Sequence, residues 1–319
     1  MRIVVALPVS DRHKELFLAA APGAELVYCV DGAVSRELAQ SADVIIGNIA
    51  PELVRGAERL KWLQLSFAGT EGFCGPGTLP DHVLLTNATG AYGMAISEHM
   101  IGMLFMLQKH LHRYYEQQKE CRWERLEPMT VVDGSTTLVI GLGDIGQTFG
   151  RKMAALGSTV IGIRKSKAPK PDWVHEQYTM DALADVIGRA DIVAMSLPGY
   201  EATRHVINGD ILRRMKPNGV IINVGRGMSI DTMALCDALN EGRIGGACLD
   251  VTEPEPLPSD HPLWRAKNVL ITPHASGGYA LAPTLDKIVA LSARNLERFM
   301  NGKPLENVID RSTGYVRRG

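Results

Sequence analysis

The amino-acid sequence predicts an α/β fold built on parallel β-sheets, and three observations support this prediction. Short runs of β-branched residues alternate with helix-length segments, an order that places the strands of one sheet parallel to one another. A glycine-rich turn joins one of these strands directly to a helix, as in doubly wound sheets. The chain has 319 residues, which is enough for two domains of about 100 to 200 residues each.

The N-terminal part of the chain contains the first set of alternating elements. Its short apolar runs have the length and composition of buried strands, and helix-length segments separate them. We therefore expect strands at Ile3–Leu7, Leu26–Cys29, Val44–Ile46, Trp62–Leu65 and Val83–Thr86, and helices at Lys14–Ala20 and Arg36–Gln40.

A longer helix is expected next, from Ile96 to about Glu120. The residues that define its face follow one another at steps of three and four, which is helical spacing. These residues are Ile101, Leu104, Phe105, Gln108 and Leu111. We interpret the segment as a spacer helix between two domains.

The alternation then restarts and predicts a second parallel sheet. Its strands are expected at Thr137–Ile140, Thr159–Ile163, Ile192–Leu197, Val220–Val224, Ala247–Val251 and Val269–Thr272. A last helix is expected at Leu281–Met300, because Gly302 and Pro304 follow it and this pair of residue types ends helices.

The charge balance excludes several classes of partner. Lys and Arg total 34 and Asp and Glu total 35, so the net charge is −1. There is no basic surplus to neutralise a phosphate backbone or an anionic membrane surface. We expect neither nucleic acid nor a membrane as a partner.

The cysteines and histidines indicate neither disulfides nor a metal site. The five cysteines are an odd number without a CxxC pair, so we interpret them as reduced thiols. His110 and His112 are two apart on the expected helix and face different directions, and we predict no metal. The apolar run at the N-terminus meets charged residues from Asp11 onward, too early for a signal peptide or a membrane span. We expect a cytoplasmic protein.

Three glycines mark a candidate dinucleotide-binding turn after the first strand of the second sheet. Gly141, Gly143 and Gly146, with Asp144 and Ile145 between them, join this strand to a helix-compatible segment. Such glycines permit a tight turn, the approach of a pyrophosphate and close packing of helix on strand. A glycine turn without a ligand is the alternative, and the coincidence of strand, turn and helix favours the cofactor site.

The residues after the next strand indicate which nicotinamide cofactor binds. An NAD-selective site usually has an Asp or Glu about 20 residues on, which binds the ribose 2′-hydroxyl. Here Arg164 stands 18 residues after Gly146 (164 − 146 = 18), and Lys165 and Ser166 follow it. Two cations and a hydroxyl suit a 2′-phosphate, so we predict NADP, with NAD as the second candidate. A solvated basic turn is the alternative.

Several motifs, the glycine turn among them, follow one another in a specific order along nearly the whole chain. They are Gly141–Gly146, Met215–Gly219, Asn223–Gly227, Leu249–Leu257 and Ile271–His274, with Leu65–Glu71 and Ile96–His99 in the first part. Together they resemble the D-2-hydroxyacid dehydrogenase family, the D-isomer-specific nicotinamide enzymes. We therefore expect a Rossmann-type doubly wound dinucleotide-binding domain at residues 97–285. A smaller flavodoxin-like substrate domain is expected at residues 1–96, with residues 286–319 returning to it.

By this resemblance, Arg226, Glu255 and His274 form the catalytic set. Arg226 would bind the carboxylate of a 2-oxo acid and polarise its carbonyl, and His274 would be the general acid and base with Glu255 as its partner. Reduction of a ketone builds negative charge on oxygen, which a guanidinium stabilises and an imidazolium neutralises with a proton. Each residue alone would more often be a surface or loop residue, but all three directly follow strands, where ligands of α/β sheets bind.

The resemblance implies further binding residues. Asp250 would bind the nicotinamide carboxamide, with a helix or loop cap as the alternative. Pro198 would lie at the adenine side of the cofactor, although Gly199 follows where a larger apolar residue is common. Ala68 and Gly69 belong to the segment that resembles the loop for the substrate carboxylate.

The predicted function is an oxidoreductase that reversibly reduces a 2-oxo acid to a D-2-hydroxy acid, with NADPH favoured. The loops expected to face the substrate, Gly47–Glu52, Ser66–Gly77 and Asn87–Met94, contain no Lys or Arg. Because a second anionic group normally recruits a cation, we expect an unphosphorylated substrate. Four aromatic residues could line an apolar wall or belong to the core: Phe67, Phe73, Tyr92 and Tyr279.

Two other functions stay open at this stage. The family resemblance extends to dehydrogenase-like, nucleotide-sensing transcriptional corepressors, although no basic arm is visible. Phosphoglycerate dehydrogenase is the other alternative, although no regulatory domain follows the last helix. The resemblance also implies a homodimer, with the long helix and the segment around Trp123 as its arm.

Overall fold

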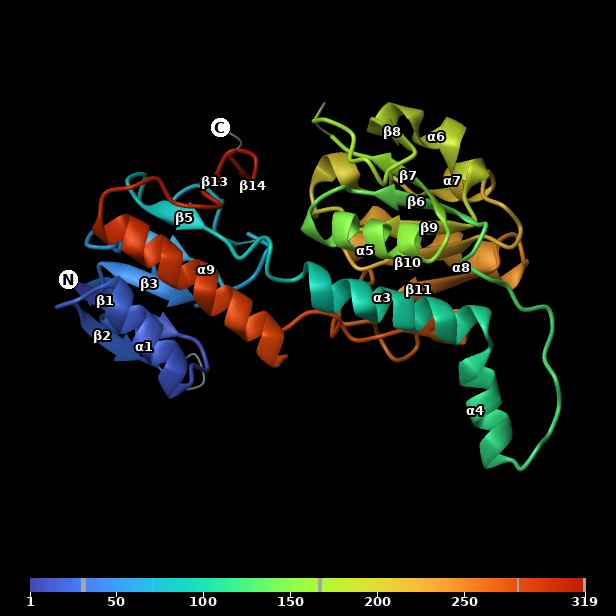
Figure 1. The fold of residues 1–319 in the computed structure, drawn as a ribbon, viewed down its shortest axis with the longest axis horizontal. Coiled ribbons are helices and arrows are strands. Elements are labelled where there is room, and N and C mark those ends of the chain that lie inside the picture. Colours follow the sequence, from blue (N-terminus) through green and yellow to red (C-terminus); the bar gives the residue numbers. More distant parts are fainter. Residues whose placement is uncertain (30–32, 71, 166–167, 280, 318–319) are drawn as a thin grey trace. The chain divides into compact units, whose positions relative to one another are not determined.

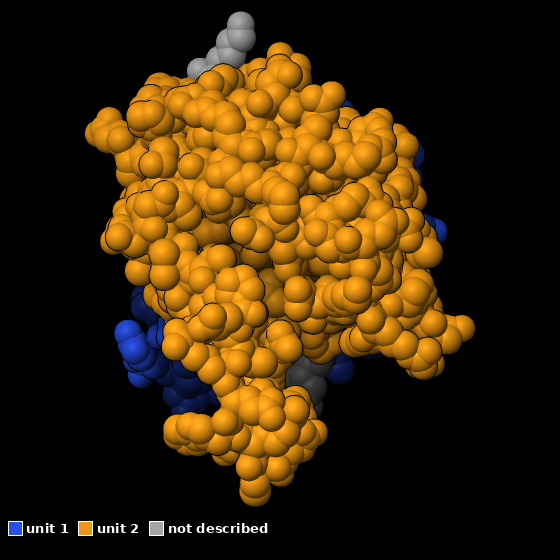
Figure 2. All heavy atoms as spheres, turned by 90° about the vertical axis from the view of Figure 1, so that its right-hand side faces the viewer, with its two compact units in different colours: residues 1–92, 278–319 blue, residues 93–277 orange. Residues whose placement is uncertain are grey.

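The computed structural model describes residues 1–29, 33–70, 72–165, 168–279 and 281–317. The chain divides into two compact units, which we call unit 1 (Met1–Tyr92 with Gly278–Gly319) and unit 2 (Gly93–Gly277). Figure 2 shows them in separate colours. The chain therefore leaves unit 1 once and returns to it for its last helix.

Unit 1 contains a flavodoxin-like sheet. In its described residues, five parallel strands lie in the order β2-β1-β3-β4-β5, which is the flavodoxin order (Figure 1). Helices α1 and α9 pack against each other. The elements are β1 (Arg2–Ala6), α1 (Asp11–Ala20), β2 (Glu25–Tyr28), α2 (Arg36–Ser41), β3 (Val44–Gly47), β4 (Trp62–Gln64), β5 (Leu84–Thr86), α9 (Ala282–Met300), β13 (Ile309–Asp310) and β14 (Tyr315–Val316).

A buried polar network attaches the C-terminal helix to the sheet of unit 1. Asn295 Nδ2 on α9 donates to Gln64 Oε1 on β4 (3.0 Å), and Thr86 Oγ1 on β5 donates to the same oxygen (2.8 Å). All three side chains are buried, so each needs such a partner inside the protein. These bonds hold α9 in unit 1 although most of the chain separates it from β4.

Unit 2 contains a Rossmann-type sheet. In its described part, seven parallel strands lie in the order β12-β11-β10-β9-β6-β7-β8. Read from β8 to β12, with the strands numbered within the unit from β6 onward, this is the Rossmann order 3-2-1-4-5-6 with β12 added at the edge. The elements are α3 (Gly93–Gln108), α4 (Leu111–Lys119), β6 (Thr136–Ile140), α5 (Asp144–Ala155), β7 (Thr159–Ile163), β8 (Glu176–Tyr178), α6 (Leu183–Val186), β9 (Ile192–Met195), α7 (Gly209–Leu212), β10 (Val220–Asn223), α8 (Thr232–Asn240), β11 (Gly246–Leu249) and β12 (Val269–Ile271).

The strand order of unit 2 positions its site. The order reverses between β6 and β9, and ligands of open α/β sheets bind at the carboxyl ends of the strands beside such a reversal. β6, β9, β10 and β11 are almost entirely buried, as expected for strands with helices on both faces. The loops that leave these strands therefore extend from a rigid core.

The structure differs from the sequence prediction in two respects. The helix expected from Ile96 to about Glu120 is two helices, α3 and α4, because His110 between them has a left-handed backbone (φ 53°). A single left-handed residue redirects a helix without interrupting the apolar spacing, so periodicity does not reveal it. β8, β13 and β14 were not predicted, because none of them is a run of apolar, β-branched residues: β8 is Glu-Gln-Tyr, and β13 and β14 have only two residues each.

Helix α4 and the segment after it form an arm that projects from the rest of unit 2 (Figures 1 and 2). The side chain of Trp123 in this arm is fully exposed, and Leu111 and Tyr115 are also exposed. Across the described ranges, no helix combines the length and the apolar character that crossing a membrane requires.

Candidate functional site

The glycine turn after β6 has a geometry that only glycine allows. Gly141 has a positive φ of 101°, and a Cβ atom on Gly146 would lie 1.9 Å from the Gly141 carbonyl oxygen. Ser196, just after β9, donates a hydrogen bond from Oγ to the same oxygen (3.0 Å). The turn after β6 is thus hydrogen-bonded to the residue that follows β9, and the strand order reverses between these two strands.

The turn leaves an open anion-binding end on helix α5. Gly143 is the N-cap residue and is exposed, and a Cβ atom built on it would meet no atom within 4 Å. The first amides of a helix attract anions, so this bare N-terminus fits a pyrophosphate. Asp144 and Ile145, both half-buried, form the first turn, and Asp144 Oδ2 accepts a hydrogen bond from the Gly93 amide (2.9 Å). The predicted dinucleotide site therefore has a suitable cradle.

The basic residues predicted to select the cofactor follow β7. Arg164 is half-buried, and its backbone amide donates to the Tyr178 carbonyl of β8 (3.0 Å). Lys165 is exposed, whereas Ser166 lies outside the described residues. Unit 2 thus carries a cation, not a carboxylate, at the end of this strand.

Pro198 lies in the loop after β9 and is half-buried. Its carbonyl oxygen accepts a hydrogen bond from Thr203 Oγ1 (2.8 Å). A Cβ atom on the next residue, Gly199, would lie 3.0 Å from Arg226 Cγ. The loop after β9 therefore runs beside the residue that the sequence predicts for binding the substrate carboxylate.

His274 and Glu255 are brought together by two loops of unit 2. The distance from His274 Nδ1 to Glu255 Oε1 is 2.5 Å, and both side chains are about half exposed. His274 has a left-handed backbone (φ 51°), and its amide donates to the Asp250 carbonyl oxygen (2.8 Å). Left-handed conformations of residues other than glycine cost free energy and are concentrated at functional sites.

Asp250 organises the turn that carries His274. Its buried carboxylate accepts hydrogen bonds from the Ala275 amide (2.8 Å), the Ser276 amide (3.1 Å) and Thr272 Oγ1 (2.6 Å). Burial opposes the charge, but the bonds from Ser276, Thr272 and Ala275 outweigh it and hold the pKa of Asp250 below its usual value. The sequence motif contains Thr272 but does not reveal this contact.

Arg226 follows β10 and is half-buried. The buried side chain of Asn223 holds its turn, because Asn223 Oδ1 accepts from the Gly225 amide (3.0 Å) and Nδ2 donates to the Arg226 carbonyl (2.9 Å). A Cβ atom on Gly227 would lie 1.9 Å from the Thr252 carbonyl oxygen. The turn of Arg226 therefore packs directly on the loop that leads to Glu255.

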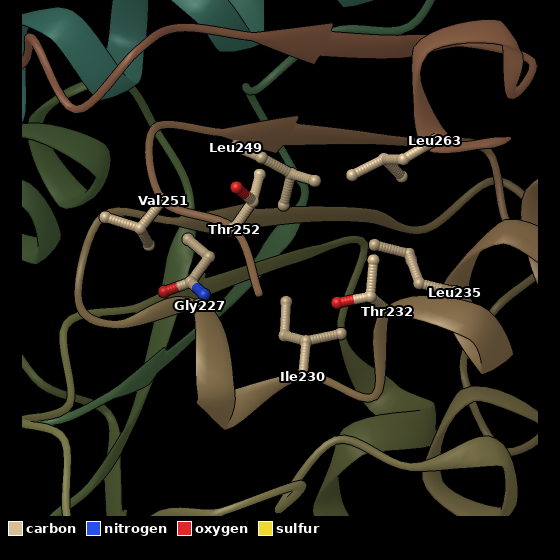
Figure 3. A pocket seen from close by; sticks show the side chains of 9 residues that line it. Gly227, Ile230, Thr232, Leu235, Leu249, Val251, Thr252 and Leu263 are labelled. Carbon is tan, nitrogen blue, oxygen red and sulfur yellow. The ribbon is translucent and has the colours of Figure 1, made fainter. Parts of the chain in front are cut away.

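A small cavity lies beneath the Arg226 turn, with a volume of about 10 Å³. Figure 3 shows Ile230 and Thr232 on one side of it and Leu249, Thr252 and Leu263 on the other. This volume is close to that of a single water-sized probe. A 2-oxo acid is far larger, so this cavity is a packing gap and not the substrate site.

In unit 1, the loop after β4 carries the residues predicted for the substrate carboxylate. Ala68 is exposed and Gly69 half-buried, and Asn87 Nδ2 donates to the Ala68 carbonyl (2.6 Å). Phe67 is exposed, and its ring stacks on that of Tyr279 with centroids 6.0 Å apart. The structure thus presents an aromatic pair next to this loop.

The other two aromatic residues of the predicted wall lie in the interior of unit 1. Phe73 is buried in the core, and Tyr92 is buried with its hydroxyl donating to the Ser66 carbonyl (2.6 Å). Burial, together with Tyr279, raises the pKa of Tyr92. These two residues belong to the core, which was the alternative considered for them.

Comparisons with known proteins identify similar chains. A family model described as D-isomer specific 2-hydroxyacid dehydrogenase, NAD binding domain, matches residues 101–276. A hydroxypyruvate reductase of Blautia hydrogenotrophica is 31% identical over 228 residues, which cover 69% of this chain and 69% of that protein.

Solved structures agree in fold over nearly the whole chain. A D-isomer specific 2-hydroxyacid dehydrogenase family protein from Aeromonas salmonicida is 31% identical, with a TM-score of 0.86 over 97% of this chain and 99% of that one. An NADPH-dependent glyoxylate/hydroxypyruvate reductase from Sinorhizobium meliloti, in complex with NADP and sulfate, is 28% identical. Its TM-score is 0.81, over 98% of this chain and 99% of that one.

Proposed function

Because this chain belongs to the D-isomer specific 2-hydroxyacid dehydrogenase family, we propose that it reduces an unphosphorylated 2-oxo acid to a D-2-hydroxy acid, with NADPH favoured. It is an NAD(P)-dependent 2-hydroxyacid dehydrogenase, an oxidoreductase with a Rossmann-type sheet. The observation that carries the proposal is the contact between His274 and Glu255 at the carboxyl edge of that sheet. In this proposal unit 2 is the dinucleotide-binding domain and unit 1 the substrate domain.

His274 is assigned the proton transfer. A carboxylate only accepts hydrogen bonds, so Nδ1 carries the proton that faces Glu255 and Nε2 is the atom that exchanges a proton with the substrate oxygen. Glu255 fixes the orientation of the ring through this contact. Arg226 binds the substrate carboxylate and stabilises the negative charge that develops on the carbonyl oxygen. We assign Ala68 and Gly69 to the same carboxylate.

The cofactor supplies the hydride when it is bound. Gly141, Gly143 and Gly146 let its pyrophosphate approach the open end of α5. Asp144 and Ile145 lie in this turn, and we place the carboxamide on Asp250 and the adenine side near Pro198. The uncapped N-terminus of α5 and the open space at Gly143 support the placement of the pyrophosphate.

NADPH is favoured because Arg164 stands where NAD-selective sites have a carboxylate. A guanidinium binds phosphate oxygens through charge-assisted hydrogen bonds, and Lys165 and Ser166 follow Arg164 in the sequence. The Sinorhizobium relative is described as NADPH-dependent and was crystallised with NADP. NAD is the second candidate.

The charge of unit 1 supports an unphosphorylated substrate. The three loops expected to face it have no Lys or Arg. The basic cluster Arg12–Lys14 on α1 would be the main argument for a phosphorylated substrate. In the structure His13 is buried against Asp286 (2.8 Å) and Lys14 contacts Asp11 (2.9 Å). The stacked rings of Phe67 and Tyr279 suit an apolar or aromatic side chain on the 2-oxo acid.

We also propose a cytoplasmic homodimer. The arm exposes Trp123, and α4 with the segment after it borders a groove of about 530 Å³ lined by Tyr114, Gln117, Trp123 and their neighbours. Large exposed aromatic residues are enriched at protein interfaces. The cytoplasmic location rests on the odd, unpaired cysteines, all five of which are free thiols.

One assay separates this function from the alternatives. Loss of reduced-nicotinamide absorbance is measured with glyoxylate, hydroxypyruvate, phenylpyruvate and 3-phosphohydroxypyruvate, each with NADPH and with NADH. The proposal requires turnover, and the highest kcat/KM with NADPH and an unphosphorylated acid. Cofactor binding without turnover of any acid supports a nucleotide-sensing corepressor, and a preference for 3-phosphohydroxypyruvate supports phosphoglycerate dehydrogenase.

A further inference from the structure

Three side chains connect helix α3 with the turn that carries His274. His99 on α3 lies with Nε2 3.0 Å from Thr272 Oγ1, and Thr272 Oγ1 lies 2.6 Å from Asp250 Oδ1. The distance from His99 Nε2 directly to Asp250 Oδ1 is 3.8 Å. Thr272 is therefore the bridge between the histidine and the carboxylate.

The protons of this chain of hydrogen bonds can be assigned from the donor inventory. Both carboxylate oxygens of Asp250 accept from main-chain amides, which can only donate, so the carboxylate acts as an acceptor. The single hydroxyl proton of Thr272 is then donated to Asp250, and the hydroxyl oxygen must accept from His99 Nε2–H. All three groups have a defined role, and removal of one leaves the buried carboxylate with weaker support.

Asp250 passes this support to His274 in two ways. Its main-chain oxygen accepts from the His274 amide (2.8 Å), and its carboxylate accepts from the amides of the next two residues, Ala275 (2.8 Å) and Ser276 (3.1 Å). The left-handed backbone of His274 is thus held on both sides by one residue. The carboxylate therefore bonds to the two residues that directly follow His274 in the chain.

We propose that His99 and Thr272 are positioning residues for His274, acting through Asp250. The inference rests on the proposed function, because it assumes that His274 exchanges the proton. His99 is on the helix that begins unit 2, 175 residues before His274 (274 − 99 = 175). The two residues contribute to turnover without contact with substrate or cofactor.

Pairs of variants that remove or keep one hydrogen-bonding group test this inference in the whole chain. Thr272→Val keeps the shape and removes the hydroxyl, whereas Thr272→Ser keeps the hydroxyl. His99→Leu removes the donor, whereas His99→Gln keeps an N–H at the place of Nε2. Thr137→Val is the matched control, because Thr137 is a buried threonine on β6 of unit 2, outside this turn. Its hydroxyl contacts Ser158 Oγ (2.7 Å), just before β7.

We expect Thr272→Val and His99→Leu to lower kcat about tenfold, since small misplacements of a reacting group cost up to about a hundredfold. KM for the 2-oxo acid should change by less than about twofold. Any loss of NADPH affinity, measured by fluorescence, should stay well below the loss in kcat, although Asp250 is also assigned to the carboxamide of the cofactor. Thr272→Ser and His99→Gln should restore most of kcat. The double variant His99→Leu with Thr272→Val should be no worse than Thr272→Val alone, because the residues act in series. Thr137→Val should lower Tm but not kcat.

A second readout needs no turnover. The ring signals of the nine histidines are recorded by NMR in the apoenzyme, and the signal of His274 is identified by its loss in His274→Ala. Thr272→Val should shift this signal, and Thr272→Ser should leave it in place.

Two results overturn the inference while the proposed function stands, provided that His274→Ala loses turnover. In the first, Thr272→Val and His99→Leu keep kcat within about twofold of the parent. In the second, Thr137→Val lowers kcat as much as these two variants do. If His274→Ala itself retains turnover, the proposed catalytic role fails instead.

Discussion

His274 Nδ1 lies 2.5 Å from Glu255 Oε1, and the residue that carries this imidazole has a left-handed backbone (φ 51°). The short contact determines which ring nitrogen carries the proton, and the backbone conformation determines where the ring points. The turn that carries His274 is held by the carboxylate of Asp250, which accepts from the Ala275 and Ser276 amides. The position of the imidazole therefore depends on this residue as well as on Glu255.

Replacement of His274 by alanine should abolish most turnover and leave cofactor binding intact, because it removes the proton donor but not the glycine cradle. We expect kcat to fall by at least about a hundredfold, with the Kd of NADPH nearly unchanged. His175→Ala is the matched control, since His175 is an exposed histidine that also lies beside a glutamate, Glu176 (3.7 Å). A kcat for His274→Ala within about tenfold of the parent would exclude the assigned role.

Arg164→Asp should reverse the cofactor preference, because it removes an attraction to the 2′-phosphate and adds a repulsion. A charge-assisted contact contributes about 1.5 to 3 kcal/mol, and each ~1.4 kcal/mol is a factor of ten. The parent should therefore prefer NADPH by roughly tenfold to a hundredfold in kcat/KM, and less at high salt. Arg151→Asp, an exposed arginine on α5, controls for net charge. A parent that prefers NADH contradicts the assignment.

Phe67→Ala should discriminate between substrates, because it removes the ring that stacks on Tyr279. We expect kcat/KM for phenylpyruvate to fall about tenfold, as for the loss of an aromatic contact. Glyoxylate is the internal control, because it has no side chain that reaches the ring. An equal fall for both acids would mean that Phe67 supports the loop and does not contact the substrate side chain.

Asp43→Asn should destabilise unit 1 in a pH-dependent way. Burial opposes the charge of Asp43, but bonds from the Arg2 amide, Arg59 and Lys61 outweigh it and lower the pKa of Asp43 to about 2. Since the folded pKa is below the unfolded one, this stabilisation is complete above about pH 4 and is lost as the pH falls toward about 2. We expect about 2 kcal/mol at neutral pH.

The measurement is urea unfolding of the parent and Asp43→Asn at neutral pH and at about pH 3, within the window given by the two pKa values. The difference in unfolding free energy should narrow as the pH falls. Asp81→Asn, which changes a fully exposed aspartate of the same unit, should show no such trend. If the difference in unfolding free energy between the parent and Asp43→Asn stayed the same at both pH values, the charge of Asp43 would not be the source of the stabilisation.

Trp123→Glu should weaken the proposed homodimer, because it puts a charge into an apolar contact. The expected result is a shift toward monomer in sedimentation velocity, with the secondary structure retained. Trp264→Glu is the control, since Trp264 is also exposed but lies outside the arm. A parent that sediments as a monomer, or a dimer that Trp123→Glu leaves unchanged, contradicts the arm assignment.

Much of the candidate site could be predicted from the sequence because its signals are local. The strand, the turn Gly141–Gly146 and helix α5 are adjacent in the chain, and the steric requirement at Gly146 arises within five residues. The carboxyl ends of parallel strands meet at one edge of a sheet. For this reason the residues after β10, β11 and β12 could be expected to share an edge before any distance was known.

Contacts between distant segments could not be predicted in this way. The bond from His99 to Thr272 joins residues 173 apart, and no pattern within either segment indicates it. The left-handed residue His110 separates α3 from α4 without a change in apolar spacing. Phe67, Phe73 and Tyr92 are chemically alike, and only packing places the first on the surface and the other two in the core.

The sequence by itself determined the alternation of strands and helices, the glycine turn and the residue types available at each strand end. These depend on backbone sterics and on short-range periodicity, which a few neighbouring residues specify. The tertiary structure alone decided the left-handed backbone of His274, the hydrogen bonds that hold the buried carboxylate of Asp250, and the bridge from His99 through Thr272. The physical reason is that burial and hydrogen-bond partners depend on segments brought together by the whole fold, and their energies do not exist until those segments meet.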